Sequence, residues 1–518
     1  MGFDVKKLGE PLLFWKYFEE ISKIPRCSGN EQQIRVYIEN IARSFEYNIK
    51  TDEIGNILVY RGRSDDDSST EGDEKISTRK QTVIFQAHLD MVCEKNKDII
   101  HNFTKESLSL QIVKKGGDKW VTAQGTTLGA DNGVGIAYCL TLMNLLSNKK
   151  WEYAQLIIKY LFTVQEETGL IGAGNINHAL VEADYLINLD SEDDTKFTIG
   201  CAGGITTIGR VKLDYIKKDE ISNTLVPIQL AIKGLLGGHS GVDINEGRAN
   251  AIKILSKILW KVNTSYGIYI SALNGGNLSN AIPREAEVCF YCDQLYKSDI
   301  LDLVERIKSE VELGISQIEP GMEILPKPLE RSETDMDMLF SNKLGEKLLH
   351  ILYVMPNGPI SIHPKDPNLV YTSTNLASLK MQEGYLEIVT SQRSLHEISK
   401  TIMHEKVEAL FRLADLGIEI HHKGEYPSWE PDYDSDLLKV AKTTYNTLFQ
   451  EEPIIQVIHA GLETGILKKQ FPSVEMISLG PNIEGGHSPD ESLQVKSVRK
   501  IWYFLSSLLE NLDMLNRK

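Results

Sequence analysis

Five segments of this chain place acidic or histidine side chains just after an apolar, strand-like run. In open α/β sheets, such positions line the edge where ligands bind. Together the segments supply two imidazoles and several carboxylates, which are donors that zinc and similar ions take in proteins. The pattern therefore indicates metal-dependent chemistry at one edge of a sheet. The segments are QAHLDMV (86–92), GTTLGADNG (125–133), LFTVQEETG (161–169), LINLDSE (186–192) and SLGPNIEGGHSPDE (478–491).

His88 and Asp90 lie two residues apart in the first segment. Residues with this spacing face the same side of a strand, so we expect their side chains to lie together. A carboxylate that holds one ring nitrogen of an imidazole commonly orients the other nitrogen toward a metal. Taken alone, the pair also fits an exposed surface pair or a buried histidine that is satisfied by hydrogen bonds.

The other acidic residues each have an ordinary structural alternative. Asp131 precedes an apolar helix and fits an N-cap, although the flanking glycines also fit a backbone bent around an ion. Glu166 and Glu167 fit surface residues, or a pair in which one binds metal and the other moves protons. Asp190 and His487 are each ambiguous alone.

The combination is more specific than any single segment. A bridging carboxylate, with one histidine and one further carboxylate for each ion, makes two sites of three protein ligands. Each site keeps an open position for water or substrate, which catalytic zinc requires. Five such segments on one sheet edge are difficult to attribute to helix capping and solvation.

The surrounding pattern predicts an α/β domain that is interrupted by a second domain. In the first part, short apolar strands alternate with helices, which favours a sheet with parallel strands. From about Ile205 the order becomes strand, helix, strand, strand, helix, and a similar unit follows, which is typical of an α+β domain with an antiparallel sheet. The α/β pattern returns after about Pro427. We therefore expect catalytic parts at 1–204 and 428–518 and an inserted domain at 205–427.

Composition excludes several classes of function. The 518 residues are 42% hydrophobic and 25% charged, which is typical of globular proteins with more than one domain. A net charge of −16 argues against nucleic acid and anionic membranes as partners. No apolar run is long enough to span a bilayer, and the N-terminal segment lacks the uninterrupted apolar core of a signal peptide. We expect a cytoplasmic protein.

The cysteines and one polar segment are expected to have structural rather than catalytic roles. The six cysteines are scattered, and only Cys289 and Cys292 form a C-x-x-C pair, within an expected strand. We therefore expect reduced structural thiols rather than a zinc ribbon or a redox pair. The polar segment between Arg61 and Gln81 is expected to be a flexible surface loop, with a functional acidic patch near Asp65–Glu74 as the alternative.

The order of the motifs matches a known family. From about Phe14 to Leu512, the chain resembles the aminoacyl-histidine (Xaa-His) dipeptidases, which belong to the two-zinc peptidases with carnosinases, tripeptidases and aminoacylases. The resemblance implies an α/β catalytic domain, with a mixed sheet flanked by helices, that is interrupted by an α+β lid and dimerisation domain. The motifs that carry it are QAHLDMV, TTLGADNG, EETG, LDSE, GCAGG, GGHSG, NAIPREA, HAGLE and GGHSPDE.

The resemblance implies a role for each candidate metal ligand. The first zinc would be held by His88, Asp131 and Asp190, and the second by Asp131, Glu167 and His487. The peptide bond after Asp131 is expected to be cis. Cobalt or manganese can serve in similar sites.

Catalytic and substrate-binding roles follow from the same resemblance. Glu166 would be the general base that activates a water between the metals, and Asp90 would orient the zinc-bound histidine. His239 would stabilise the transition-state oxyanion, in many relatives at the partner subunit's active site. Arg393 would grip the C-terminal carboxylate of the substrate, with Asn280 as a further contact. An exposed strand charge is the alternative for Arg393.

These features predict that a homodimer with two divalent ions, zinc for preference, hydrolyses Xaa-His and related unblocked dipeptides. An aminoacylase or deacetylase with the same metals is the alternative enzyme. A metal-binding scaffold without catalysis is the alternative from another class, and an intact Glu166 argues against it because a ligand-only site does not need a base. The expected partner is a small peptide substrate, with neither nucleic acid nor membrane.

Overall fold

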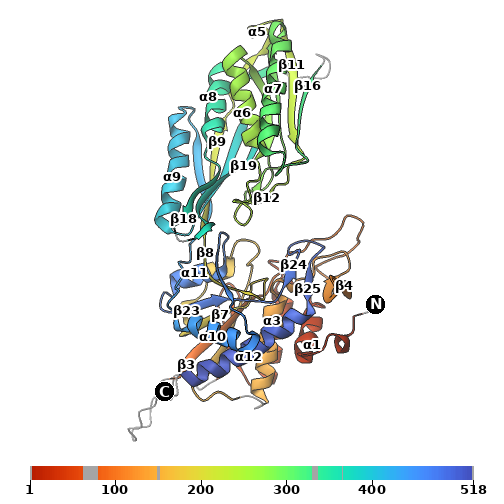
Figure 1. Cartoon of the computed structure of the whole chain (residues 1–518), viewed down its shortest axis with the longest axis vertical. Helices are drawn as coiled ribbons and strands as arrows, with labels where there is room; N and C mark the ends of the chain where they lie inside the picture. The colour runs from red at the N-terminus through yellow and green to blue at the C-terminus, as the bar shows by residue number, and fades with distance from the viewer. Residues whose placement is uncertain (1–2, 62–79, 149–151, 330–336, 365, 516–518) are drawn as a thin grey trace. The chain divides into compact units, whose positions relative to one another are not determined.

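The computed structural model describes residues 3–61, 80–148, 152–329, 337–364 and 366–515 (Figure 1). The segment near Asp65–Glu74, for which we expected a surface loop, lies outside these residues. Every helix in the described part of the chain is too short or too polar to cross a bilayer. The chain divides into two compact units: unit 1 contains Met1–Gly200, Trp429–Val457 and Leu462–Lys518, and unit 2 contains Cys201–Ser428 and Ile458–Gly461.

Unit 1 is built on an eight-stranded sheet whose central strands run parallel. Strand β3 pairs in parallel with β6 and β7, and β7 pairs in parallel with β23. The carboxyl ends of these strands therefore meet at one edge. In sheet order the strands are β1 (Asn48–Thr51), β2 (Ile57–Tyr60), β6 (Leu156–Thr163), β3 (Gln81–His88), β7 (Tyr185–Asn188), β23 (Glu475–Ser478), β8 (Lys196–Cys201) and β22 (Ile454–Ile458).

The helices of unit 1 share one hydrophobic core with this sheet. Helix α3 packs on α1 and on β3, and α10 packs on α12 (Figure 1). Because α3 is apolar on nearly every side, it is buried along most of its length. The helices are α1 (Leu12–Ile21), α2 (Gln32–Ser44), α3 (Ala130–Ser147), α4 (Ile171–Gly174), α10 (Asp436–Phe449), α11 (Glu463–Gln470) and α12 (Val495–Leu515). A second sheet has the order β24 (Ile483–Glu484), β25 (Ser492–Gln494), β5 (Asp118–Ala123), β4 (Leu110–Lys115).

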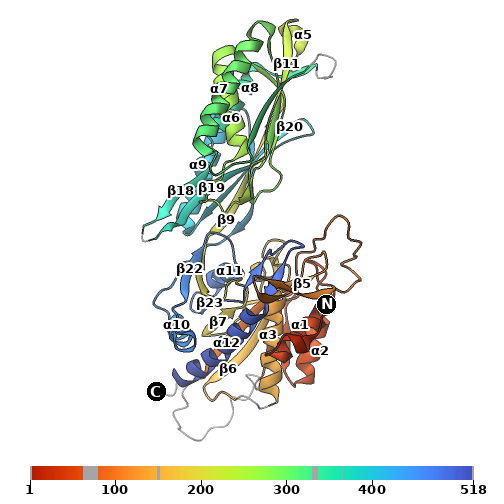
Figure 2. The same cartoon turned by 45° about the vertical axis from the view of Figure 1, so that its right-hand side comes forward.

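Unit 2 is an antiparallel sheet with helices on one side (Figures 1 and 2). Helices α6 (Ala251–Tyr266), α7 (Lys297–Ile315), α8 (Asn342–Val354) and α9 (Glu397–Leu413) contribute to a core of its own. In sheet order the strands are β16 (Glu323–Pro328), β11 (Leu225–Lys233), β15 (Ala286–Asp293), β13 (Tyr269–Gly275), β19 (Asp366–Gln382), β20 (Tyr385–Ser394), β9 (Gly203–Lys212) and β21 (Glu419–Tyr426), with β18 (Gly358–His363) beside β19.

The two similar α+β halves expected in the inserted region form one sheet. Strand β13 of the first half pairs with β19 of the second through Gly275 and Leu379. The fold class predicted from the sequence, an α/β domain interrupted by an α+β domain, is confirmed. The return of Ile458–Gly461 to unit 2 had no counterpart in the sequence pattern.

Candidate metal centre

Most of the candidate site residues of unit 1 come from the ends of the parallel strands. His88 is the last residue of β3, Glu166 and Glu167 follow β6, and Asp190 follows β7. Because β3 pairs in parallel with both neighbours, these ends lie side by side. Two ligands arrive from elsewhere: Asp131 from the first turn of α3 and His487 from the loop after β24.

Asp131 lies between the two histidines. The His88 Nε2 atom is 2.8 Å from Asp131 Oδ1, and the His487 Nε2 atom is 3.1 Å from Asp131 Oδ2. Each imidazole also faces one further carboxylate, since His88 Nε2 is 3.3 Å from Asp190 Oδ1 and His487 Nε2 is 3.1 Å from Glu167 Oε2. The arrangement comprises two groups of three potential ligands that share Asp131, and the donor atoms in each group lie within 4.8 Å of one another.

The alternative in which Asp131 caps a helix is wrong. The N-cap of α3 is Gly129, which has no side chain that could cap the helix. Asp131 itself has non-helical backbone angles, and the peptide bond between Asp131 and Asn132 is cis, as the resemblance implies. The carboxylate of Asp131 is therefore directed at the histidines rather than at the helix terminus.

The electrostatics of this cluster favour cations. Burial raises the pKa of Asp190 to about 7 and raises the pKa of Glu166 well above its ordinary range. Burial also acts to raise the pKa of Asp131, but hydrogen bonds with the two histidines lower it below its ordinary value. Hydrogen bonds with Asp131 and Glu167 raise the pKa of His487 to about 11.

One buried oxygen also lacks a partner. The Glu167 Oε1 atom has no hydrogen-bond donor among the described residues. Acceptors that converge in a buried place without enough donors are costly, and a divalent cation offsets that cost. The residues present therefore fit two divalent ions that share Asp131.

Asp90 supports both His88 and the glutamate pair. Its Oδ1 atom lies 3.4 Å from His88 Nδ1 and accepts the backbone N–H of Glu166 at 3.0 Å, while Oδ2 accepts the N–H of Glu167 at 3.2 Å. The hydroxyl of Ser28 donates a further hydrogen bond at 2.7 Å. Although burial acts to raise the pKa of Asp90, these partners, His88 first, lower it to about 2. Asp90 is thus an ionised support that positions both groups.

Two glutamates near the site were not singled out from the sequence. Glu491 accepts hydrogen bonds from four consecutive backbone N–H groups, those of residues 128–131, at 2.7 to 3.2 Å. It therefore holds the turn that carries Asp131. Glu463 accepts hydrogen bonds from Gln86 and Thr163, and burial raises its pKa to about 7. Glu491 ends the motif GGHSPDE and Glu463 ends the motif HAGLE, so these two motifs could have pointed to both glutamates.

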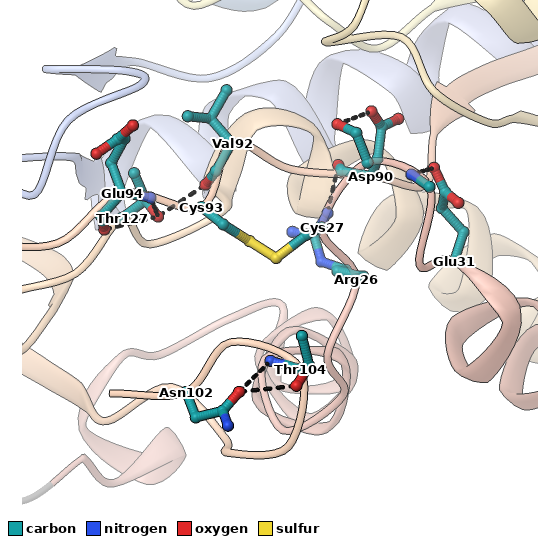
Figure 3. The surroundings of a disulfide bond; sticks show 12 residues. Arg26, Cys27, Glu31, Asp90, Val92, Cys93, Glu94, Asn102, Thr104 and Thr127 are labelled. Carbon is teal, nitrogen blue, oxygen red and sulfur yellow. Dashed lines mark hydrogen bonds between the residues drawn. A yellow bond between two sulfur atoms is a disulfide. The ribbon is translucent and has the colours of Figure 1, made fainter. Parts of the chain in front are cut away.

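A disulfide bond lies beside Asp90 (Figure 3). Cys27 and Cys93 are joined, with their Cα atoms 5.7 Å apart, so the expectation of reduced thiols is wrong for this pair. The adjacent Arg26 donates hydrogen bonds to the carbonyl oxygens of Leu89 and Asp90, at 3.0 and 2.7 Å. Residues 26–27 are therefore tied to the segment after β3 by both hydrogen bonds and the disulfide. Cys289 and Cys292 carry thiols, as expected.

The remaining candidate residues belong to unit 2. His239 ends β12 (Gly238–His239), which pairs with β14 (Ala281–Ile282), and the Asn280 carbonyl accepts the Ser240 N–H at 2.8 Å. Arg393 lies in β20 and is only 6% exposed, so it is not an exposed strand charge. One of its terminal nitrogens donates to the hydroxyl of Tyr426.

His459 joins this group in unit 2, although the sequence interpretation assigned it no role. Burial, followed by the positive charges of Arg393 and His239, lowers the pKa of His459 to about 3. Its Nε2 atom lies 2.7 Å from the Ser373 hydroxyl. Arg393 and His239 therefore lie close enough to His459 for their charges to act on it.

Comparison with known proteins identifies the family. The sequence model of the family described as peptidase family M20/M25/M40 matches residues 84–511 of this chain. The cytosol non-specific dipeptidase of Escherichia coli (strain K12) is 34% identical over 512 residues, which are 97% of this chain and 98% of that protein. The chain belongs to peptidase family M20/M25/M40.

Solved structures agree with this assignment. The aminoacylhistidine dipeptidase from Vibrio alginolyticus is similar with a TM-score of 0.81 and 31% identity, over 98% of each chain. A tripeptidase from Staphylococcus aureus shares the fold with a TM-score of 0.53 and 15% identity, also over 98% of each chain. The similarity covers both units, so the inserted region is part of the shared architecture.

Proposed function

We propose that this protein is a metal-dependent dipeptidase that hydrolyses unblocked dipeptides, Xaa-His dipeptides among them. The observation that carries the proposal is Asp131 between His88 and His487, with a further carboxylate beside each imidazole. Similarity along the whole chain to two dipeptidases supports the substrate class.

Zinc is the ion we propose, because the ligands combine imidazoles and carboxylates, and cobalt or manganese are alternatives. When bound, such ions polarise the scissile carbonyl and lower the pKa of water. One ion would be held by His88, Asp131 and Asp190, and the other by Asp131, Glu167 and His487.

Glu166 is proposed to move the proton. Its carboxyl group is buried with His88, Asp190 and Glu463 near it, and the raised pKa suits a group that accepts and then returns a proton. It takes a proton from the attacking water and gives it to the leaving amine. Asp90 holds the backbone of Glu166 and the ring of His88 in place for this step.

Residues of unit 2 are proposed to bind the substrate. Arg393 receives the C-terminal carboxylate, because its buried guanidinium offers a fork of donors. His239 stabilises the oxyanion and Asn280 adds a contact, roles that rest on the resemblance. We further propose that the inserted domain, residues 205–427, acts as a lid, and that the protein works as a cytoplasmic homodimer.

The test uses purified full-length protein with dipeptides and N-acyl amino acids, before and after chelation. We expect hydrolysis of free dipeptides that is lost with chelation and restored by zinc. Glu166→Gln should abolish turnover and keep the metal content, whereas Glu182→Gln, an exposed residue, should change neither. Faster turnover of N-acyl amino acids would favour an aminoacylase. No turnover of either class by the zinc-loaded wild type would favour a scaffold.

A further inference from the structure

A second cluster of potential metal ligands lies in unit 2. His404 and Glu408 are four residues apart in α9, so they share one face of that helix. His422 lies in β21, two residues from Ile420, which packs against the core of unit 2. Alternation along the strand therefore turns His422 toward the same core. The three side chains each offer a donor atom, and these atoms lie within 4.8 Å of one another.

The hydrogen bonds around His422 determine which ring nitrogen carries a proton. The amide nitrogen of Gln392 donates to the Thr390 hydroxyl at 2.8 Å, and its Oε1 accepts from the Thr207 hydroxyl at 2.8 Å. Thr207 has one hydroxyl proton and has used it, so it accepts from His422 Nδ1, which is 3.2 Å away. The other nitrogen of the neutral ring, Nε2, then presents a lone pair.

That lone pair faces a carboxylate. His422 Nε2 lies 3.2 Å from Glu408 Oε2. Two acceptors at this distance repel each other unless a proton or a metal ion lies between them. A proton on His422 would satisfy this pair only, because His404 Nδ1 would remain buried with no hydrogen-bond partner among the described residues. The centroids of the two histidine rings lie 4.9 Å apart. A metal ion would engage all three residues.

The surroundings suit a cation held by these three donors. Arg412 donates to Glu408 Oε1, which leaves Oε2 for the ion and sets the orientation of the carboxylate. Glu405 and Glu425 add negative charge that acts on His404. The Thr207 hydroxyl accepts a hydrogen bond from His422 Nδ1 and so orients the ring, as residues behind a metal-binding histidine commonly do.

We propose that His404, Glu408 and His422 form a binding site for one divalent transition-metal ion, with zinc the best match. Two imidazoles and one carboxylate form a ligand set that zinc takes, with a fourth position left for water. The side chains of His422 and Glu408 are 31% and 26% exposed, so an ion can enter from solvent. The ion would link α9 to β21, the last strand in the order of this sheet.

The test counts bound zinc in the full-length protein by equilibrium dialysis at fixed free zinc. His404→Gln, Glu408→Gln and His422→Asn should each hold one equivalent less per chain than the wild type. The matched controls are His421→Asn, beside His422, and Glu346→Gln in α8, and both of these residues are exposed. Both controls should keep the wild-type number. The comparison is a difference between variants, so it does not depend on how many ions unit 1 holds.

A second variant tests the proton argument. Thr207→Val removes the acceptor for His422 Nδ1 and should weaken zinc binding at this site by about 10- to 100-fold. Zinc should also raise the melting temperature of the wild type by more than that of the ligand variants. Equal zinc numbers in the wild type and the folded ligand variants would overturn the proposal, as would an equal loss in His421→Asn. Three independent ligand variants keep the test decisive if one of them fails to fold.

Discussion

The two clusters of histidine and carboxylate residues in this protein use the same donors in different settings. In unit 1 three of the potential ligands, His88, Glu167 and Asp190, stand at the ends of buried parallel strands, and the buried carboxylates of Asp90 and Glu491 hold the backbone beside Glu167 and Asp131. In unit 2 the cluster joins one helix face to an edge strand and is partly exposed. A catalytic metal site needs ligands in fixed positions and limited access for water. A site that only links a helix to a strand needs side chains that are long enough to meet at one ion.

Removing Asp131 should have the largest effect. Because this residue lies within 3.1 Å of both His88 and His487, Asp131→Ala should lose both ions of unit 1 and all detectable dipeptide hydrolysis. The cluster in unit 2 should keep its one zinc, which separates the two sites. Metal analysis and an activity assay measure both, with Asp98→Ala, an exposed residue, as the control. Retention of metal and turnover in Asp131→Ala would break the assignment of the bridge.

Arg393→Ala should reduce kcat/KM for free dipeptides by roughly 30-fold to several thousand-fold. A buried charge pair that loses one partner costs about 2–5 kcal/mol. C-terminally amidated dipeptides lack the carboxylate, so their hydrolysis should change much less. Arg210→Ala, in the same sheet, serves as the control. Equal wild-type rates on free and amidated dipeptides would refute carboxylate capture, and an unaffected Arg393 variant would move the role to another residue.

Glu491→Gln tests whether the metal site of unit 1, unlike the cluster in unit 2, depends on buried residues that hold the backbone of its ligands. A glutamine places an NH₂ group where backbone N–H groups need an acceptor, so the turn of residues 128–131 should loosen. We expect zinc affinity in unit 1 to weaken by about 10- to 100-fold, as for other outer partners of metal ligands. Competition with a chromogenic chelator measures it, and Glu484→Gln is the control. Unchanged affinity would show that the turn holds Asp131 without Glu491.

Loss of the Cys27–Cys93 disulfide should have the smallest effect on activity of the changes considered, and its main effect should be on stability. The double variant Cys27→Ser with Cys93→Ser should lower the free energy of unfolding of unit 1 by about 2–4 kcal/mol relative to the oxidised wild type. Urea unfolding measures this difference, and Cys289→Ser should behave as the wild type. The reduced wild type lacks the Cys27–Cys93 bond, so its stability should match that of the double variant. Equal stability of the oxidised wild type and the double variant would contradict a supporting role.

Local sequence determined much of this protein. Apolar strands alternating with helices predicted the α/β domain, and the change of pattern near Ile205 predicted an inserted α+β domain. The candidate residues His88, Glu167 and Asp190 stood out because each follows an apolar strand. Such signals are readable in a single sequence because strand and helix periodicities are local, and because parallel strands bring their carboxyl ends to one edge.

Only the tertiary structure decided which distant residues meet. Glu491 bonds to a backbone N–H 360 residues away, and Cys27 bonds to a cysteine 66 residues away. The joining of two α+β halves into one sheet, and the meeting of His404 with His422, depend likewise on how helices and strands pack. Packing of this kind is set by the shapes and volumes of many side chains at once, so no short stretch of sequence contains it.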